Sequence, residues 1–528
     1  HFLSGDIDNG GSQFAGNSQR TTHQNNSGFY VQDNFRFSRK LTLNAGLRWD
    51  YFGVIYEDGN RFSLFHAATL VAVGKPGGIP RLYPRDLNNF APRFSAAYDL
   101  RGDGNTIVRA GWGLYYDAFS QDFFIGHFPF NTFNPGPAYN GIGADAINSA
   151  GNVASTIVNG VPIFTGFAPT TDTWTVDQKI RTPYIQNYNV NIEQALGKQM
   201  ALTVGYVGSA GTKLFRFRDL NQANIATGTL PFSGFNIINQ FESTSTSRYN
   251  SLQVTWKLRN LHGLNSQLSW TWSHSIDNAS DGEDFVPNAA QPDNSLNPGA
   301  EKGSSNFDAR HRLTWMFGYD FPKYATAKSF TNGWSINGLL RLSSGQPYNL
   351  NSFENFNNSN EFFERPDVIG NPFTGTGGHS KLLNLGAFAA PCDWDPTAGA
   401  CAGGFHFGNL GRNAFVGPDF KNFDFSLAKD TKLGEHVNMQ LRADVFNLFN
   451  HPNFSNPTLP NFLVDLETNG GVASVTGDPK CAAPPFVGCR AFGQGFLPTN
   501  ATPDVAIGYP FLGGGGSRDI QLALKFTF

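Results

Sequence analysis

The last twelve residues, SRDIQLALKFTF (517–528), alternate between polar and apolar side chains. The apolar row runs from Ile520 to Phe528, and the other row contains Gln521 and Lys525. Successive side chains of a β-strand point to opposite faces of a sheet, so this segment predicts a strand with one apolar and one largely polar face. The apolar row continues to the final residue, so its surroundings have to be explained.

The same alternation recurs along the chain, for example in LTLNAGLRWDY (41–51) and RLTWMFGYDF (312–321). A period of two residues excludes amphipathic helices for these segments. In this prediction, 213–217 extends the strand at 199–208, and GFHFGNLG (404–411) is the candidate for one further strand. The strong predicted strands span residues 28–37, 41–51, 91–100, 105–117, 184–196, 199–208, 249–259, 264–274, 309–321, 332–345, 420–430, 436–450 and 517–528.

Composition excludes several classes of protein. Charged residues make up 15% of the 528 residues and the formal net charge is -3, which argues against a protein that binds nucleic acid by neutralising phosphates. The 59 Gly and the 14% of aromatic residues suit strands and loops better than long helices. No uncharged apolar run reaches the roughly 18 residues of a membrane helix. The chain begins at His1 in a loop-like stretch, which we interpret as a missing N-terminus, so the lack of a targeting segment indicates nothing about location.

The connections between the predicted strands alternate between short and long. Loops longer than about 15 residues are uncommon in compact soluble domains, whereas short periplasmic turns and long extracellular loops are typical of outer-membrane barrels. The short connections lie at 38–40, 101–104, 197–198, 260–263, 322–331 and 431–435, and the long ones at 52–90, 118–183, 209–248, 275–308, 346–419 and 451–516.

The pattern therefore predicts an all-β fold, a transmembrane antiparallel up-and-down β-barrel with long extracellular loops. The apolar row of each strand would meet lipid and the polar row would meet the lumen. A final strand that closes a barrel can end on Phe528, because lipid covers its apolar face and its backbone groups are paired. A soluble β-sandwich or lectin-like protein is the weaker alternative, since it would have to bury many aromatic rows.

Several motifs carry a resemblance to a known family. They are NSGFYVQDNFRFSRKLTLNAGLRWDYF (26–52), NFDARHRLTWMFGYDFP (306–322), GNLGRNAFVGPDFKNFDFSLAKD (408–430), LRADVFNLFNHPNF (441–454) and RDIQLALKFTF (518–528). Together they resemble the Oar-like branch of the TonB-dependent outer-membrane receptors. The resemblance covers the chain from about residue 27 to its end, and it is specific for the barrel rather than for a ligand.

The resemblance implies a function and a set of partners. Residues 1–27 would be the remnant of an extracellular loop. Residues 28–528 would be the C-terminal part of the barrel, about 14 strands of a 22-stranded barrel, in the outer membrane of a Gram-negative bacterium. It would move or bind a bulky solute, a glycan or a peptide, with energy from the inner membrane, through a plug region that contacts the TonB complex and is missing here. Outer-membrane lipid and the barrel-assembly machinery would be further partners, the latter reading the terminal aromatics Phe526 and Phe528. The alternative is an adhesin or glycan-binding barrel without active transport.

The polar rows supply the candidate lumen residues. Because both signs of charge are mixed in this set, no ion selectivity follows, and the simplest expectation is an interior whose charges are solvated or paired with one another. The predicted lumen-facing residues are Arg48, Asp50, Arg109, Asp117, Glu193, Arg312, Arg341, Arg442, Asp444 and Lys525, joined by Lys257 and Arg259.

No catalytic or metal-binding motif is evident, so we predict no enzyme, no cofactor and no metal site. The histidines lack H-E-x-x-H spacing, and no serine or cysteine stands in a nucleophile context such as G-x-S-x-G. SIDNASDGEDF (275–285) gathers Asp277, Asp281, Glu283 and Asp284. Calcium suits such oxygen ligands, but the spacing differs from an EF-hand loop, so we favour a solvated acidic loop.

The four cysteines fall into two close pairs, Cys392 with Cys401 and Cys481 with Cys489. Four cysteines allow three pairings, and the short separations favour these two. Disulfides form in oxidising compartments, so both bonds are expected if the loops lie outside the cytoplasm. Free thiols are the expectation for a cytosolic chain.

Overall fold

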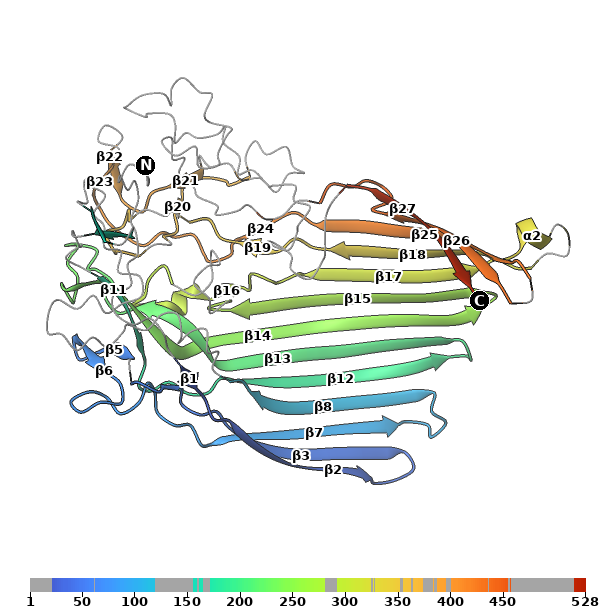
Figure 1. Ribbon diagram of the computed structural model, residues 1–528, viewed down its shortest axis with the longest axis horizontal. Helices are drawn as coiled ribbons and strands as arrows, with labels where there is room; N and C mark the ends of the chain where they lie inside the picture. Colours follow the sequence, from blue (N-terminus) through green and yellow to red (C-terminus); the bar gives the residue numbers. More distant parts are fainter. Residues whose placement is uncertain are drawn as a thin grey trace, which may run out of the picture.

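The large sheet contains thirteen antiparallel strands that are hydrogen-bonded in chain order (Figure 1). They are β2 (Ser27–Arg36), β3 (Leu41–Tyr51), β7 (Asn89–Asp99), β8 (Thr106–Tyr116), β12 (Tyr184–Leu196), β13 (Met200–Asp219), β14 (Phe235–Leu261), β15 (Leu264–Asp277), β17 (His311–Asp320), β18 (Trp334–Ser343), β25 (Phe420–Lys432), β26 (Asn438–Phe446) and β27 (Asp519–Thr527). Two short strands, β11 (Thr171–Val176) and β16 (Gly303–Ser304), pair with the sheet beside this path. The computed structural model describes residues 21–60, 62–118, 155–158, 161–164, 171–280, 292–323, 326, 328–351, 355–361, 364–373, 383, 387–395, 400–434, 436–453, 456 and 517–528.

Each of the strong predicted strands is confirmed as one strand of this sheet. Two strands are much longer than predicted, because β13 has 20 residues and β14 has 27. Their extra residues pair with each other beyond the rest of the sheet, as in the pair Arg216 and Glu242. The segment 213–217 lies in β13, as predicted.

The further strand predicted at 404–411 is wrong, because the structure has no strand there. Gly408 lies so close to the backbone carbonyl of Arg365 that even a methyl group would collide with it. The segment is used for loop packing instead, and the backbone carbonyl of Leu410 accepts a hydrogen bond from the Arg365 side chain. Alternating Phe and Gly over a few residues therefore did not indicate a strand here.

All long connections leave the sheet at one end and all short turns lie at the other, which are the left and right ends of Figure 1. The tightest turn joins β14 to β15 through His262 and Gly263, which both have positive φ values of 51° and 89°. This combination is that of a type I′ turn, which matches the twist of a hairpin. The predicted alternation of short and long connections is confirmed.

One face of the sheet carries large apolar side chains that lie open on the surface. Leu522 is 75% exposed and Trp272 is 52% exposed, although residues of this kind are usually buried. Aromatic rings stack across neighbouring strands on this face, as in Phe94 on Trp112 with ring centroids 6.2 Å apart. The exposed apolar set includes Phe29, Leu47, Ile192, Tyr206, Trp315, Leu427 and Leu441. A bilayer would cover such a face, whereas a soluble β-sandwich would have buried it.

The buried hydrophobic residues gather at the long-loop end. One cluster contains Ile55, Phe62, Leu64, Val73, Leu82, Tyr83, Val176, Ile180, Phe217 and Phe241, and a second contains Tyr348, Leu350, Phe356, Leu383, Ala387, Phe388, Ala390, Leu410 and Phe415. The described parts of the connections 52–90 and 346–419 therefore contribute to hydrophobic cores outside the main sheet. Within the described parts of the chain, no helix is long and apolar enough to span a membrane.

The two outermost strands each have one free side. Among the described residues, β2 pairs only with β3, and β27 pairs only with β26. The sheet is accordingly open between these two strands in the part of the chain that the structure describes.

Candidate functional site

The strand register places the predicted lumen residues on the face opposite the apolar one. Residues directly across an antiparallel ladder share a face, and the ladder connects Asp444 with Gln521, Gln440 with Lys525, and Arg109 with Asn191. The residues on this polar face include Arg48, Asp50, Arg109, Glu193, Lys257, Arg312, Arg341, Arg442, Asp444 and Lys525.

Most of these charges form ion pairs within the polar face. Arg48 lies 2.7 Å from Asp50, and Arg442 lies 2.8 Å from Asp444. In both pairs the partner is two residues further along the same strand. Arg109 reaches Glu193 on the next strand at 2.9 Å. Each pair joins a cation to an anion, so the polar face has little net charge along these strands.

Arg341 pairs with Asp424, a residue that the sequence analysis did not name, at 3.1 Å. The alternation in FDFSLAK already put Asp424 in the polar row, so it could have been found from the sequence. Asp117 follows β8, Arg312 lies on β17 and Lys525 on β27. None of these three forms an ion pair with a described residue, so the structure does not bring them together.

Amide side chains complete the polar face beside these ion pairs. Asn44 donates to Ser95 at 2.9 Å, and Asn191 donates to Asn189 at 3.1 Å. Asn191 also lies over Gly205, directly opposite on the neighbouring strand, where a methyl group would collide with it. This row of uncharged polar groups was not predicted, because charge alone defined the expected lumen residues.

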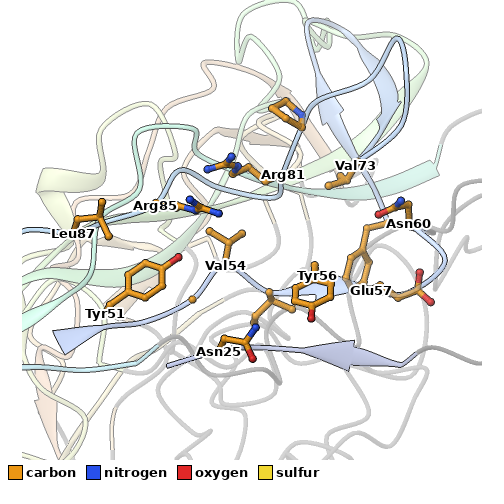
Figure 2. A pocket seen from close by; sticks show the side chains of 15 residues that line it. Asn25, Tyr51, Val54, Tyr56, Glu57, Asn60, Val73, Arg81, Arg85 and Leu87 are labelled. Carbon is orange, nitrogen blue, oxygen red and sulfur yellow. The ribbon is translucent and has the colours of Figure 1, made fainter. Parts of the chain in front are cut away.

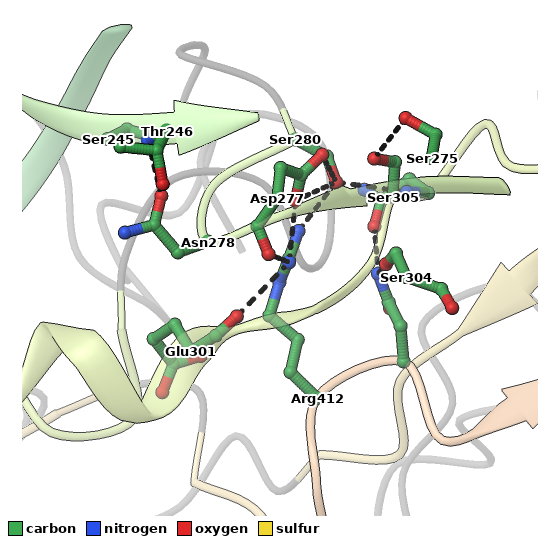
Figure 3. Close-up of polar contacts among 12 residues, drawn as sticks. Ser245, Thr246, Ser275, Asp277, Asn278, Ser280, Glu301, Ser304, Ser305 and Arg412 are labelled. Carbon is green, nitrogen blue, oxygen red and sulfur yellow. Dashed lines mark hydrogen bonds and ion pairs between the residues drawn. The ribbon is translucent and has the colours of Figure 1, made fainter. Parts of the chain in front are cut away.

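A buried network of charges joins two long connections at the loop end, 275–308 and 346–419 (Figure 3). Arg412 donates to the Asp277 carboxylate at 2.7 Å and also to the hydroxyl of Ser280. Both side chains of the ion pair are nearly inaccessible, with 3% and 2% exposure. Asp277 therefore does not belong to a solvated acidic loop, and that expectation is wrong for this residue. Asp281, Glu283 and Asp284 lie outside the described residues.

A second arginine extends this network. Arg365 forms a two-pronged pair with Glu301, at 2.7 and 2.9 Å, and lies 3.4 Å from Asp293. Arg412 links the two halves by donating to the backbone carbonyl of Glu301. We call Arg412, Asp277, Ser280, Glu301, Arg365 and Asp293 the loop-end network. Removing one partner of such a buried pair is costly, because a charge is left without compensation.

Buried carboxyl groups next to the network hold their protons more tightly than usual. Burial raises the pKa of Asp293 to about 6, although the Arg365 charge opposes the rise. Burial also raises the pKa of Glu364 to about 8 and places the pKa of Glu361 well above its ordinary value. The described residues contain no group of His, Cys, Asp and Glu that could hold a metal ion.

The loop end also holds an open pocket with a volume of about 470 Å³ (Figure 2). It lies between the segment before β2 and the connection from β3 to β7. Its lining includes Asn25, Tyr51, Val54, Tyr56, Glu57, Asn60, Val73, Arg81, Arg85 and Leu87. Tyr51 ends the predicted strand at 41–51, whereas the other lining residues lie in no motif that the sequence analysis singled out.

Cys392 and Cys401 form a disulfide whose Cα atoms are 5.8 Å apart. It joins the two sides of the hairpin of β22 (Asp393–Asp395) and β23 (Ala400–Gly403), next to the second hydrophobic cluster. Cys481 and Cys489 lie outside the described residues, so their pairing stays a prediction. The proposed assembly signal lies on β27 and just after it: Phe526 pairs with Met439, and Phe528 is 92% exposed.

The sheet is a wide antiparallel meander with an exposed apolar face and a polar face of paired charges, and its long loops all lie at one end. These are the features of a membrane-spanning β-barrel of the outer membrane. The chain belongs to the family described as outer membrane beta barrel domain, which matches residues 1–479. Its location is therefore the bacterial outer membrane. No curated protein matches the sequence significantly.

Several solved structures of outer-membrane proteins are similar to this chain. The transporter YddB from Escherichia coli is 11% identical and has a TM-score of 0.45, with 81% of this chain and 42% of that chain covered. The siderophore receptor PiuA from Acinetobacter baumannii is 9% identical and has a TM-score of 0.44, with 96% and 43% covered. The ferric enterobactin receptor from Pseudomonas aeruginosa is 11% identical and has a TM-score of 0.44, with 96% and 45% covered. The chain thus spans less than half the length of each.

Proposed function

We propose that this chain is the barrel region of a TonB-dependent outer-membrane transporter of the Oar-like branch, which moves a bulky solute with energy from the inner membrane. The observation that carries the proposal is the polar face that runs across all thirteen strands of one sheet. A barrel of about eight strands is filled by its own side chains, whereas wider barrels enclose a channel or a plug. A sheet of this width therefore supports a lumen that is wide enough to hold a plug.

The orientation of the chain follows from the same proposal. In this family the last strand runs toward the periplasm, so the turn that contains Gly434 would face the periplasm. The loop-end network and the pocket would then face the outside of the cell. Extracellular loops would present the solute to the lumen, and TonB would displace the plug along the polar face.

The ion pairs on the polar face suit this mechanism. Charges that already form ion pairs, such as Arg48 with Asp50, attract a passing segment of the plug less strongly than unpaired charges would. The barrel itself performs no chemistry in this account. It supplies a wall with paired charges and amides, and the loops select what enters.

Association with TonB provides the test, because it does not require the solute to be known. The full-length protein, purified in detergent, is mixed with the periplasmic domain of TonB from the same cell. We expect a complex that is lost when the segment preceding the plug is deleted. The proposal fails if no complex forms and no plug precedes residue 1 in the complete reading frame.

An adhesin or glycan-binding barrel is the second candidate, and the folded long loops favour it. Two hydrophobic clusters and a disulfide give the loop end a structure of its own, as a binding surface would require. A barrel of this class would show glycan binding that is unchanged in cells without TonB.

A further inference from the structure

The pocket at the loop end has a cationic side that lacks an internal partner. Figure 2 shows the side chains of Arg81 and Arg85 on one side of the pocket, across from Asn25 and Tyr56. Neither guanidinium forms a hydrogen bond or an ion pair with any residue that the structure describes. A guanidinium presents several donors in a planar fork, which matches a carboxylate.

The single carboxylate of the lining does not face this side. Glu57 lies at the far end of the pocket, beside Asn60 and away from Arg85 and Tyr51 (Figure 2). The apolar lining, which we call the floor, consists of the accessible Val54, Pro80 and Leu87 and of the buried Ile55, Phe62 and Val73. A cationic side over an apolar floor suits a solute that carries one negative group on an apolar body.

The pocket wall is built from fixed parts. Tyr83, which is buried in the first hydrophobic cluster, accepts a hydrogen bond from the Ile55 backbone at 3.1 Å and donates to the Gly53 carbonyl at 3.3 Å. Gln24 and Asn26 bind the same segment from the other side, at 3.2 and 3.0 Å. Ligand sites are usually largely formed in advance, with volumes of about 300–1,000 Å³, and this pocket meets both conditions.

We propose that this pocket binds a carboxylate solute with an apolar body, such as the C-terminal residue of a peptide. Arg81 and Arg85 hold the carboxylate, and the accessible apolar side chains of Val54 and Leu87 contact the apolar part. Tyr51 and Asn25 offer further polar contacts at the rim. Binding itself is independent of transport, but its use as the first step of solute uptake rests on the function proposed above.

A pair of probes that differ only in charge tests the proposal. N-acetyl-phenylalanine carries the carboxylate, and N-acetyl-phenylalaninamide is its neutral counterpart of almost equal shape. Binding of each is measured by calorimetry on the full-length protein in detergent, which needs neither TonB nor an energised membrane. We expect the acid to bind at least about tenfold more tightly than the amide, because the amide cannot form hydrogen bonds between a carboxylate and the two guanidinium groups.

The variants Arg81→Gln and Arg85→Gln should each weaken binding of the acid by about tenfold and leave the amide unchanged. Arg101→Gln is the matched control, since Arg101 is an exposed arginine in a turn at the other end of the sheet. Heat-modifiable gel mobility checks that each variant is folded.

Equal affinity for acid and amide would overturn the proposal, as would unchanged binding in both pocket variants. No binding of the acid by the wild-type protein at millimolar concentration would also overturn it. If the protein binds the acid but does not associate with TonB, the proposed transport function is contradicted and the proposed carboxylate site is not.

Discussion

At the scale of single residues, the two rows of each strand differ in what a new charge costs. Leu522 lies on the apolar face of β27 and Gln521 on its polar face, opposite Asp444. Leu522→Arg should destabilise the barrel by roughly 2–4 kcal/mol if it lies near the bilayer midplane. Gln521→Arg should cost far less, because its new charge can pair with Asp444.

Heat-modifiable gel mobility against urea concentration compares these two variants. Val254→Arg and Gln253→Arg on β14 form a second pair with the same parity. Equal losses within both pairs would contradict the assignment of the faces.

Glu364 makes the loop end sensitive to pH. Burial raises its pKa in the folded protein to about 8, above its value in an unfolded chain. Its contribution to stability is therefore complete below its ordinary pKa and is lost as the pH rises through about 8. The backbones of Phe356 and Asn357 donate hydrogen bonds to the carboxyl group, which favours its ionised form and opposes the rise of its pKa.

Thermal unfolding of the loop end, followed on either side of about pH 8, measures this effect. Glu364→Gln should make the midpoint less dependent on pH, because glutamine keeps an acceptor oxygen and does not ionise. An unchanged pH dependence in this variant would assign the effect to another group.

At the scale of elements, the loop-end network joins segments that are far apart in the sequence. Arg412→Met leaves the Asp277 carboxylate buried without its cation, and such losses cost about 3–5 kcal/mol. Adding Asp277→Asn should recover part of the loss, because the uncompensated charge is gone. Arg341→Met is the control, since that pair is partly exposed. Proteolysis of the loop end measures the effect, and equal resistance of all these variants would contradict the role of the network.

The terminal aromatic residue of the last strand should matter more for barrel assembly than an exposed aromatic residue elsewhere. Deleting Phe528 removes the terminal aromatic of the proposed assembly signal, whereas Phe330→Ala removes another highly exposed ring from a connection at the short-turn end. We expect the deletion to reduce the folded barrel in outer-membrane fractions and Phe330→Ala to leave it unchanged. Normal insertion without Phe528 would contradict the assembly signal.

The strands were predictable from sequence, and the loop end was not, for a physical reason. In the strand 41–51, the position of each residue in the alternation predicts which face of the sheet it lies on, so the strand can be recognised from local sequence alone. Arg412 and Asp277 lie 135 residues apart, and nothing in either local sequence indicates that they meet. The extension of β14 was missed because β11 (Thr171–Val176) and β13 pair with it, and such tertiary pairing leaves no local pattern.

At the scale of the whole molecule, the proposed function requires one orientation of the barrel across the membrane. The long-loop end contains the loop-end network, the pocket and the disulfide, and the short turns lie at the opposite end (Figure 1). If the short turns face the periplasm, everything that could contact a solute from outside lies in the long connections.

Labelling of intact cells with a membrane-impermeant maleimide tests this orientation most directly. Leu296→Cys places a thiol on an exposed residue at the long-loop end, and Gly434→Cys places one in the turn between β25 and β26. We predict that Leu296→Cys is labelled on intact cells and that Gly434→Cys is labelled only after the outer membrane is permeabilised. Labelling of Gly434→Cys but not of Leu296→Cys on intact cells would contradict the account.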